Sequence, residues 1–286
     1  MAAALLVATC WGGNFAASKF ALTDFPPFIA VLLRFMIVSV LLAPLALRKP
    51  MPRLRDMLFI ALTLIVLHFA FIFIAITHGL TITSVIVATQ MGVPFSCIVS
   101  AVLFKDYLGP WRSVGLTVAF IGVLIIAGTP NASEYWGAFL LAILGALAWS
   151  SANIYLKRMP PTPVVCLLFW PALLSLPFLL ALTLLFEQNQ LTSILTSHKL
   201  AWAGIAYNTA ISSLLGYGLW NWLISRYPLS HVAPYTLFAP VVGIATGVWL
   251  FDEPLTLQII LGALLSIIGV TIITLRRPRL AELEKA

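Results

Sequence analysis

Two pairs of tryptophan and asparagine residues, set in otherwise apolar stretches, are the side chains of this sequence best suited to hold a small molecule. Trp11 and Asn14 form the first pair, and the second pair, Trp149 and Asn153, begins 138 residues later. An indole offers a rigid face for packing or stacking, and a carboxamide both donates and accepts hydrogen bonds. Amides and small residues also serve close helix packing, but their recurrence in both halves of the chain favours the lining of a polar cavity.

Other polar side chains lie within apolar stretches, where a buried polar group is costly and normally faces the protein interior. His68 lies near the middle of such a stretch, as a cavity residue or a packing residue, and His78 lies near an end, at the expected mouth of the cavity. The remaining binding candidates are Thr81, Gln90, Met91, Tyr207, Tyr217, Tyr235 and Phe238. Two stripes of residues 199–222 compete for the inward face: Tyr207, Leu214, Tyr217 and Asn221, or Asn208 and Ser212.

Glycine and proline mark the segments that are candidates for movement. A proline frees a backbone carbonyl and can bend a helix, although a static kink explains such prolines equally well. Arg34, a basic residue well inside an apolar stretch, could attract a substrate carboxylate or snorkel outward. The gating and hinge candidates are Gly12, Gly13, Arg34, Pro94, Pro234 and Pro240.

The composition indicates an integral membrane protein. Of the 286 residues, 62% are hydrophobic and 9% are charged, whereas a soluble domain carries about 25% charged residues. The net charge of +7 comes from basic residues in short connections, which is typical of membrane topology and not of a nucleic-acid-binding face. The cysteines lack metal-binding or redox spacing, and no zinc-protease, hydrolase or P-loop motif occurs. We therefore expect no enzyme, no metal and no other cofactor.

Ten apolar stretches have about the length of a membrane-spanning helix, which is roughly 20 residues. They cover residues 2–22, 26–47, 57–77, 80–104, 110–128, 134–155, 163–186, 199–222, 230–251 and 256–275. Most Lys and Arg residues follow the even-numbered stretches, so the positive-inside rule places both termini in the cytoplasm. The predicted fold is an all-α membrane protein of ten transmembrane helices, in a bacterial inner membrane.

The two halves of the chain are related to each other. Residues 104–122 align with residues 251–269 at a constant shift of 147. The glycines in register, which we expect to form packing surfaces, are Gly115, Gly122, Gly262 and Gly269. Because each half has five spans, equivalent segments must face opposite sides of the membrane, and such inverted repeats are typical of secondary transporters. The predicted domains are a first repeat over residues 1–129, a second repeat over residues 134–276 and a cytoplasmic tail over residues 277–286.

Four stretches resemble the paired EamA domains of the drug/metabolite transporter superfamily. They are WGGNFAASK, FIAVLLRF, the segment from Pro94 into LFKDYLG, and PYTLFAPVVGIATGVWLFDEPLTLQIILGALLSIIGV. Within the superfamily the sequence is most similar to the YddG-type exporters of aromatic amino acids. This resemblance implies a basket-like bundle with a central cavity lined mainly by the first, third, fourth, sixth, eighth and ninth spans. Because the second span is not among them, we expect Arg34 to have a structural or gating role.

The resemblance and the repeat together predict a monomeric exporter of aromatic and other neutral amino acids that works by alternating access. Its partners are then a small-molecule substrate and membrane lipids. No acidic residue lies deep in a span, so coupling to protons would depend on His68 or His78, and we expect a uniporter. Lipophilic cations, which bind to aromatic faces, are the alternative substrates, and an intramembrane enzyme is the remote alternative. Nucleotide sugars are less suitable substrates, because their phosphates would require several intramembrane cations and only Arg34 qualifies.

Overall fold

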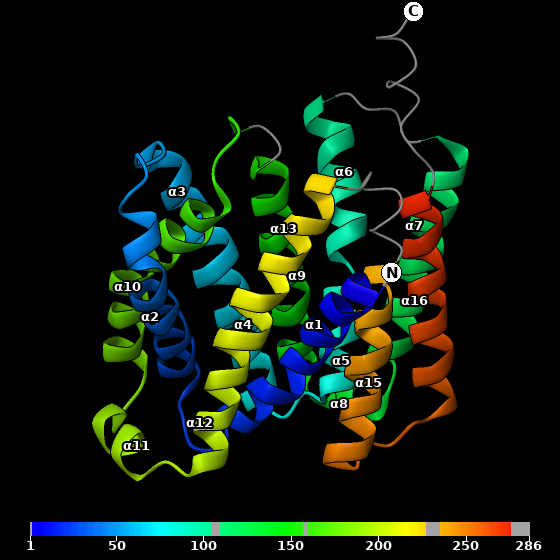
Figure 1. The fold of residues 1–286 in the computed structure, drawn as a ribbon. Coiled ribbons are helices and arrows are strands. Elements are labelled where there is room, and N and C mark those ends of the chain that lie inside the picture. The colour runs from blue at the N-terminus through cyan, green and yellow to red at the C-terminus, as the bar shows by residue number, and fades with distance from the viewer. Residues whose placement is uncertain (1, 105–108, 157–158, 227–234, 276–286) are drawn as a thin grey trace, which may run out of the picture.

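The computed structural model describes residues 2–104, 109–156, 159–226 and 235–275, which form helices joined by short connections (Figure 1). The α-helices of the first part are α1 (Ala2–Ala21), α2 (Pro27–Ala46), α3 (Leu54–Ile60), α4 (His68–Thr77), α5 (Ile82–Thr89), α6 (Gly92–Phe104), α7 (Pro110–Ala127) and α8 (Pro130–Glu134). They are followed by α9 (Trp136–Leu156), α10 (Val164–Phe186), α11 (Gln190–Thr196), α12 (Lys199–Ala206), α13 (Tyr217–Arg226), α15 (Phe238–Phe251) and α16 (Leu257–Leu275).

Seven helical segments are long and apolar enough to cross a membrane. They are Pro27–Ala46, Leu54–Thr77, Ile82–Val99, Pro110–Ala127, Trp136–Leu156, Val164–Phe186 and Leu257–Leu275. Each coincides with a predicted span, and the prediction of a multi-pass membrane protein is confirmed. The other three predicted spans fall on α1, on the continuous helical run from α12 to α13, and on α15, which has 14 residues.

Two helix pairs form opposite flanks of the bundle, with α2 on α10 at one side and α7 on α16 at the other (Figure 1). Between them α1 packs against α12 and α15, while α9 packs against α4, α5 and α6. A continuous cluster of buried aliphatic and aromatic side chains joins the helices of the two halves. In a membrane, helices associate through such packing and through small residues at their contacts, because lipid offers no hydrophobic driving force between them.

Glycines make the contact between α7 and α16. A Cβ atom added to Gly115 would lie 2.8 Å from the carbonyl oxygen of Gly269, and one added to Gly262 would lie 2.8 Å from that of Gly122. Both distances are shorter than real Cβ contacts allow, so a side chain here would force the backbones apart. The packing role predicted for these four glycines is confirmed.

Two spans contain a stretch of π-helix, in which each backbone hydrogen bond joins residues five apart instead of four. The first, η1 (Ala61–Leu67), joins α3 to α4, and the second, η2 (Tyr207–Gly216), joins α12 to α13. They occupy the third and the eighth predicted spans, which are corresponding members of the two halves. Local π-helical geometry is rare and often occurs at functional sites. The sequence did not predict either stretch.

The fourth predicted span is interrupted where proline interferes with helical hydrogen bonding. Gln90 and Met91 form a turn between α5 and α6. Pro94 has no N–H, so the carbonyl of Gln90 lacks its usual α-helical partner and instead accepts a hydrogen bond from the N–H of Val93 at 3.3 Å. The bend predicted at Pro94 is present as a break just before it.

Carboxylates cap three helix starts at the lower end of the bundle in Figure 1, which we call the capped end. Glu187 accepts hydrogen bonds from the first backbone N–H groups of α2, with 3.1 Å to the nitrogen of Ile29. Asp24 accepts one from the N–H of His198 at 2.6 Å, at the start of α12. This backbone hydrogen bond is the main cause of the lowered pKa of Asp24. An anion is favourable at a helix start, where N–H groups lack partners.

Glu253 makes the third cap and joins the two halves of the chain. Its carboxylate, carried on a side chain that is nearly buried, accepts hydrogen bonds from the N–H groups of Ile82 at 2.7 Å and Thr83 at 3.0 Å, at the start of α5. The Nζ atom of Lys19 lies 3.3 Å from the same carboxylate and 4.2 Å from the ring centre of Phe251. The end of α1 and the start of α5 are therefore held by one residue of the second half.

Candidate functional site

Arg34 lies in α2 as a buried cation in the interior of the bundle, with 1% of its surface exposed. Its Nε and Nη2 atoms donate hydrogen bonds to the hydroxyl of Ser213 at 3.2 and 3.0 Å. The guanidinium lies 4.2 Å from the ring centre of Phe69 and 5.2 Å from that of Phe35. Arginine stacks on aromatic faces in this way, so the rings and the hydroxyl together fix the plane of the guanidinium.

A chain of hydrogen bonds runs from Arg34 to the first helix. The Ser213 hydroxyl donates to the backbone carbonyl of Asn208 at 2.9 Å, five residues earlier in η2. The Nδ2 atom of Asn208 donates to the hydroxyl of Ser18 at 3.2 Å, and that hydroxyl donates to the carbonyl of Asn14 at 2.8 Å. Residues from α2, η2 and α1 thus form one polar cluster, which we call the central cluster: Asn14, Ser18, Arg34, Asn208 and Ser213.

Several polar atoms in and beside the central cluster are buried without a hydrogen-bond partner. They are Nε1 of Trp11, Oδ1 of Asn14, Nη1 of Arg34, Oδ1 of Asn208 and Oγ1 of Thr209. An unpaired buried polar group costs about 1–3 kcal/mol, and more when it is charged, so native interiors keep few of them. Five such atoms on α1, α2 and η2 concentrate unpaired hydrogen-bonding groups in this part of the bundle.

Aromatic rings border the central cluster. Trp11 packs on Tyr217, with 5.4 Å between ring centres, and on Trp220, with 5.6 Å. Gly216 allows this approach, since a Cβ atom there would lie 2.7 Å from Nε1 of Trp11. The hydroxyl of Tyr207 reaches the backbone of α1, where the carbonyl oxygen of residue 10 lies 3.4 Å away. The structure thus brings four predicted residues together here: Trp11, Asn14, Tyr207 and Tyr217.

Comparisons with known proteins place this architecture in a family. The sequence profile of the EamA-like transporter family matches residues 1–128 and again residues 136–275. The chain belongs to the EamA-like transporter family. It is a transporter and not an enzyme, as the sequence predicted.

Relatives of this EamA-like transporter include efflux proteins. It is 32% identical to a "Probable amino-acid metabolite efflux pump" of Salmonella typhimurium, over 94% of this chain and 92% of the relative. It is 31% identical to a protein of the same name from Escherichia coli, over the same shares. A "Probable terminal-alkyne amino-acid exporter" of Streptantibioticus cattleyicolor is 26% identical over 96% of this chain and 93% of the relative.

A solved structure described as "Crystal structure of protein" has the same fold as this transporter. Its TM-score is 0.67, and the match covers 99% of this chain and 98% of the other at 17% identity. At that identity the likeness concerns the fold alone.

The second tryptophan–asparagine pair of the transporter lies on α9, beside the break between α5 and α6. A Cβ atom on Gly92 would lie 2.9 Å from the ring of Trp149, so the indole packs closely on the start of α6. The Nδ2 atom of Asn153 donates to the carbonyl of Trp149 in its own helix at 2.8 Å. Met91 is buried and Gln90 is half-buried at the same break. These contacts differ in kind from those of the first pair, because the amide donor of Asn153 is used locally.

His68 lies at the start of α4 and is held by another helix. Its Nδ1 atom lies 2.9 Å from the carbonyl oxygen of Gly145 in α9. The sequence left two roles open for His68, that of a cavity residue and that of a packing residue. This contact between two helices is the one expected of a packing residue. His78 is exposed near the capped end, where its Nδ1 atom lies 2.9 Å from the carbonyl oxygen of Ile74 in its own helix.

The remaining predicted residues of the transporter are spread over the bundle. Thr81 caps α5 by accepting a hydrogen bond from the N–H of Ser84 at 3.3 Å. Tyr235 packs beside Ala4, Val7 and Leu223, and Phe238 is 47% exposed. Gly12 and Gly13 allow α1 to approach Ala239 and the ring of Tyr207, and Pro240 is buried. Pro234 lies outside the described residues.

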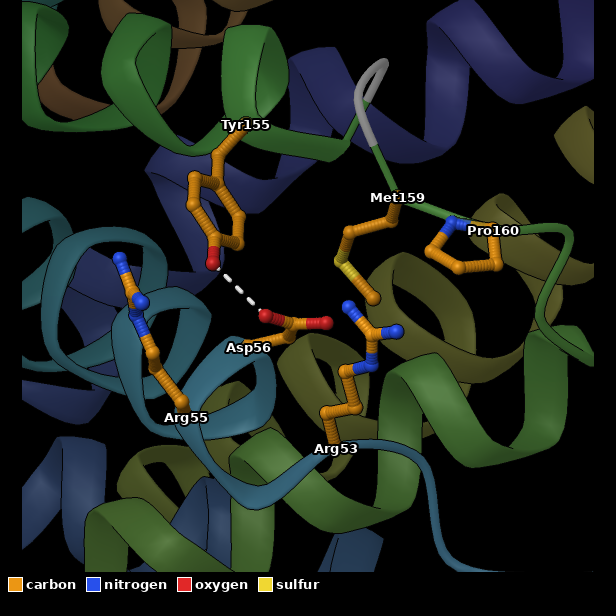
Figure 2. A pocket seen from close by; sticks show the side chains of 6 residues that line it. All are labelled: Arg53, Arg55, Asp56, Tyr155, Met159 and Pro160. Carbon is orange, nitrogen blue, oxygen red and sulfur yellow. Dashed lines mark hydrogen bonds between the residues drawn. The ribbon is translucent and has the colours of Figure 1, made fainter.

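A pocket of about 300 Å³ opens elsewhere, between α3, α9 and the start of the next connection (Figure 2). Figure 2 shows Arg53 and Arg55 on either side of Asp56, whose Oδ1 atom accepts a hydrogen bond from the hydroxyl of Tyr155 at 2.7 Å. Met159 and Pro160 complete its lining. None of the predicted binding residues lies there. The described residues contain no group of His, Cys, Asp and Glu that could hold a metal ion.

The central cluster includes residues that sequence reasoning passed over. Ser213 and Phe69 were not candidates, and Asn208 was one of two alternatives. A helix of 3.6 residues per turn puts Ser213 on a different face from Asn208, whereas the π-helical turn brings its hydroxyl to the Asn208 carbonyl. Polarity was the available signal, since η2 has the sequence YNTAISSLLG in the middle of a span.

Proposed function

We propose that this transporter exports neutral amino acids, aromatic ones among them, and related amino-acid metabolites through the central cluster by alternating access. The single observation that carries this proposal is the cluster itself, in which a buried guanidinium and two unpartnered amide oxygens lie beside aromatic rings. Polar groups of both kinds suit the two charged ends of an amino acid, and rings suit its side chain. The efflux function in the printed names of three relatives supports the same substrate class.

The helix contacts support two inverted repeats, each of five spans. The contact of α1 with α12 joins the first and eighth spans, and its counterpart under exchange of the halves is the contact of α9 with α4. The contact of α1 with α15 has a counterpart in that of α9 with α5 and α6. The glycine contacts of α7 and α16 also exchange into each other. Together with the two matches of the family profile, this favours ten spans related by a pseudo-twofold axis in the membrane plane.

The orientation of the protein in the membrane follows from the charge distribution. Positively charged connections at one end of the bundle favour a cytoplasmic location for that end and for both chain termini. The capped end then faces outward from a bacterial inner membrane. A lipophilic cation is a less suitable substrate than an amino acid, because the buried guanidinium of Arg34 repels positive charge beside the rings.

The test is transport by the purified protein in liposomes. Radiolabelled phenylalanine, leucine, lysine and a lipophilic aromatic cation are loaded, and efflux is measured with and without an imposed pH gradient, against protein-free liposomes. We expect phenylalanine and leucine to leave faster than from the control, at a rate that the pH gradient does not change. Movement of the lipophilic cation without movement of any amino acid would show the proposed substrate class to be wrong. Accumulation driven by the gradient would replace the uniporter with a proton-coupled carrier.

A further inference from the structure

Resting on the proposed function, we infer that Arg34 anchors the carboxylate of a zwitterionic amino acid and that the amide oxygens of Asn14 and Asn208 receive its ammonium group. The sequence alone favours a gating or structural role for Arg34. The geometry points instead to a binding role, because one edge of the guanidinium is fixed and the other edge is left without a partner.

The fixed edge of Arg34 orients the free one. Its Nε and Nη2 atoms are committed to Ser213, and the rings of Phe35 and Phe69 hold the guanidinium plane. Nη1 is buried and has no hydrogen-bond partner. Guanidinium groups recognise carboxylates through parallel N–H donors in a rigid fork. A side chain held in this way presents donors to an anion without further loss of conformational freedom.

The described residues supply no counterion for this cation. In the described part of the chain the ion pairs are those of Lys19 with Glu253 and of His198 with Asp24, so Arg34 has no carboxylate partner. A buried charge without a partner is strongly unfavourable, and ionisable residues inside membrane spans normally serve function. A substrate carboxylate is the group that would complete the site.

Acceptors for the other end of the substrate come from Asn208 and Asn14, and Asn14 joins the hydrogen-bonded chain through its backbone carbonyl. Asn208 is completely buried, and because its Nδ2 atom is bonded to Ser18, its Oδ1 atom is left as a free acceptor. Oδ1 of Asn14 is also buried and unpartnered. An ammonium group has three donors and no acceptor, so it complements two amide oxygens. The site as a whole offers one positive charge and two neutral acceptors, which matches a zwitterion.

The experiment compares phenylalanine with relatives that lack one of its charged ends. Binding to the purified transporter is measured by calorimetry for phenylalanine, phenylalanine amide, phenethylamine and N-acetylphenylalanine. We expect the amide and phenethylamine, which have no carboxylate, to bind at least about tenfold more weakly than phenylalanine. N-Acetylphenylalanine, which has no ammonium group, is expected to bind more weakly as well, and replacement of Asn14 by Leu should weaken phenylalanine binding but not binding of this analogue.

Substitutions of Arg34 give the second arm. Arg34→Gln should abolish measurable phenylalanine binding and counterflow, and Arg34→Lys, which keeps the charge but loses the fork, should bind at an intermediate level. Ser39→Ala is the matched control, since Ser39 is buried in the same helix and its hydroxyl bonds only to the carbonyl of Phe35 at 2.8 Å. We expect this control to bind and transport like the unaltered protein.

The outcomes separate the two proposals. If the unaltered protein moves phenylalanine but binds its amide equally well, or if folded Arg34→Gln binds phenylalanine normally, the anchor is wrong and the exporter function stands. If the unaltered protein neither binds nor moves any amino acid, both are wrong. Should Arg34→Gln fail to fold, the comparison of phenylalanine with its amide on the unaltered protein decides the question without a variant.

Discussion

The third and eighth spans both contain a π-helical stretch, but the two stretches differ in the polarity of their side chains. Each passes from α-helix into a π-helical stretch and back. In the third span, η1 has the sequence ALTLIVL, and the hydroxyl of Thr63 donates to the carbonyl of Phe59 in its own helix at 2.7 Å. In the eighth span, η2 carries a tyrosine, an asparagine, a threonine and two serines, and its side chains reach α1 and α2. Of the two π-helical stretches, η2 contributes side chains to the central cluster, where they meet residues of α1 and α2 from the first half.

This difference matters for a substrate with two unlike ends. A site with exact twofold symmetry would present the same groups to a carboxylate and to an ammonium. An asymmetric site fixes one orientation, because the central cluster combines one cation, that of Arg34, with unpartnered amide oxygens and has no second cation. In the proposed mechanism, symmetry of the helices serves alternating access and asymmetry of the side chains serves recognition.

Among changes that compare the two π-helical spans, the largest expected effect comes from removing the hydroxyl that orients Arg34. Ser213→Ala deprives Nε and Nη2 of their acceptor, so the guanidinium is no longer held in place. We expect the initial rate of phenylalanine counterflow to fall roughly tenfold or more, as for the loss of a hydrogen bond to a charged group. Thr63→Val is the matched change in η1 and should leave the rate within about twofold. The hydroxyl of Thr63 bonds within its own helix, and a substitution that removes such a local bond has a small effect. Equal losses of counterflow rate in both variants would show that η1 and η2 do not differ in their contribution to substrate binding.

A smaller effect is expected from closing the gap between helices beside each π-helix. A Cβ atom on Gly204, in α12, would lie 2.7 Å from the backbone nitrogen of Ala21, whereas one on Gly145 would lie 3.3 Å from the carbonyl oxygen of His68. Backbone cannot move aside as a side chain can, so Gly204→Ala should destabilise the protein by about 1–3 kcal/mol, and Gly145→Ala by less. The midpoint of unfolding in mixed detergent measures both. A greater loss for Gly145→Ala would show that the α4–α9 contact is the tighter one.

The smallest effect concerns the helix starts that lead into the π-helices. The start of α12 is capped by Asp24, whereas α3 begins after Arg53 without a side-chain cap. Hydrogen bonding to the His198 N–H lowers the pKa of Asp24, so its stabilisation is present above the ordinary carboxyl pKa and is lost as pH falls through the lowered value. The unaltered protein should therefore lose thermal stability more steeply below about pH 4 than Asp24→Asn does. Parallel curves of melting temperature against pH for the two proteins would show that ionised Asp24 does not stabilise the start of α12.

Much of the architecture could be predicted from composition and spacing. Apolar runs of the right length identify spans because lipid leaves few alternatives to a helix, and the glycines of α7 and α16 identify a contact because only small residues permit it. Pro94 marks a break for a reason that depends on one residue alone. Features that depend on a single local cause were therefore accessible to sequence reasoning.

The site depends on contacts between residues far apart in the chain, which the sequence alone does not predict. The partner of Arg34 is 179 residues away in the chain, and no hydropathy pattern reports a π-helical turn, which changes the face on which Ser213 lies. The place of His78 at the mouth of a cavity stays a prediction, since its ring is exposed and bonded within its own helix. Polar residues in a span show that something must satisfy them, but only the fold shows whether that is a neighbour or a substrate.

Glu253 has a consequence for how the helices separate at the capped end. One side chain of the second half holds two amides of α5 and the ammonium of Lys19, so these bonds cannot be released one by one without leaving charge stranded in a nonpolar setting. Parting of α1 and α5 from Glu253 at that end therefore breaks the ion pair and both amide hydrogen bonds.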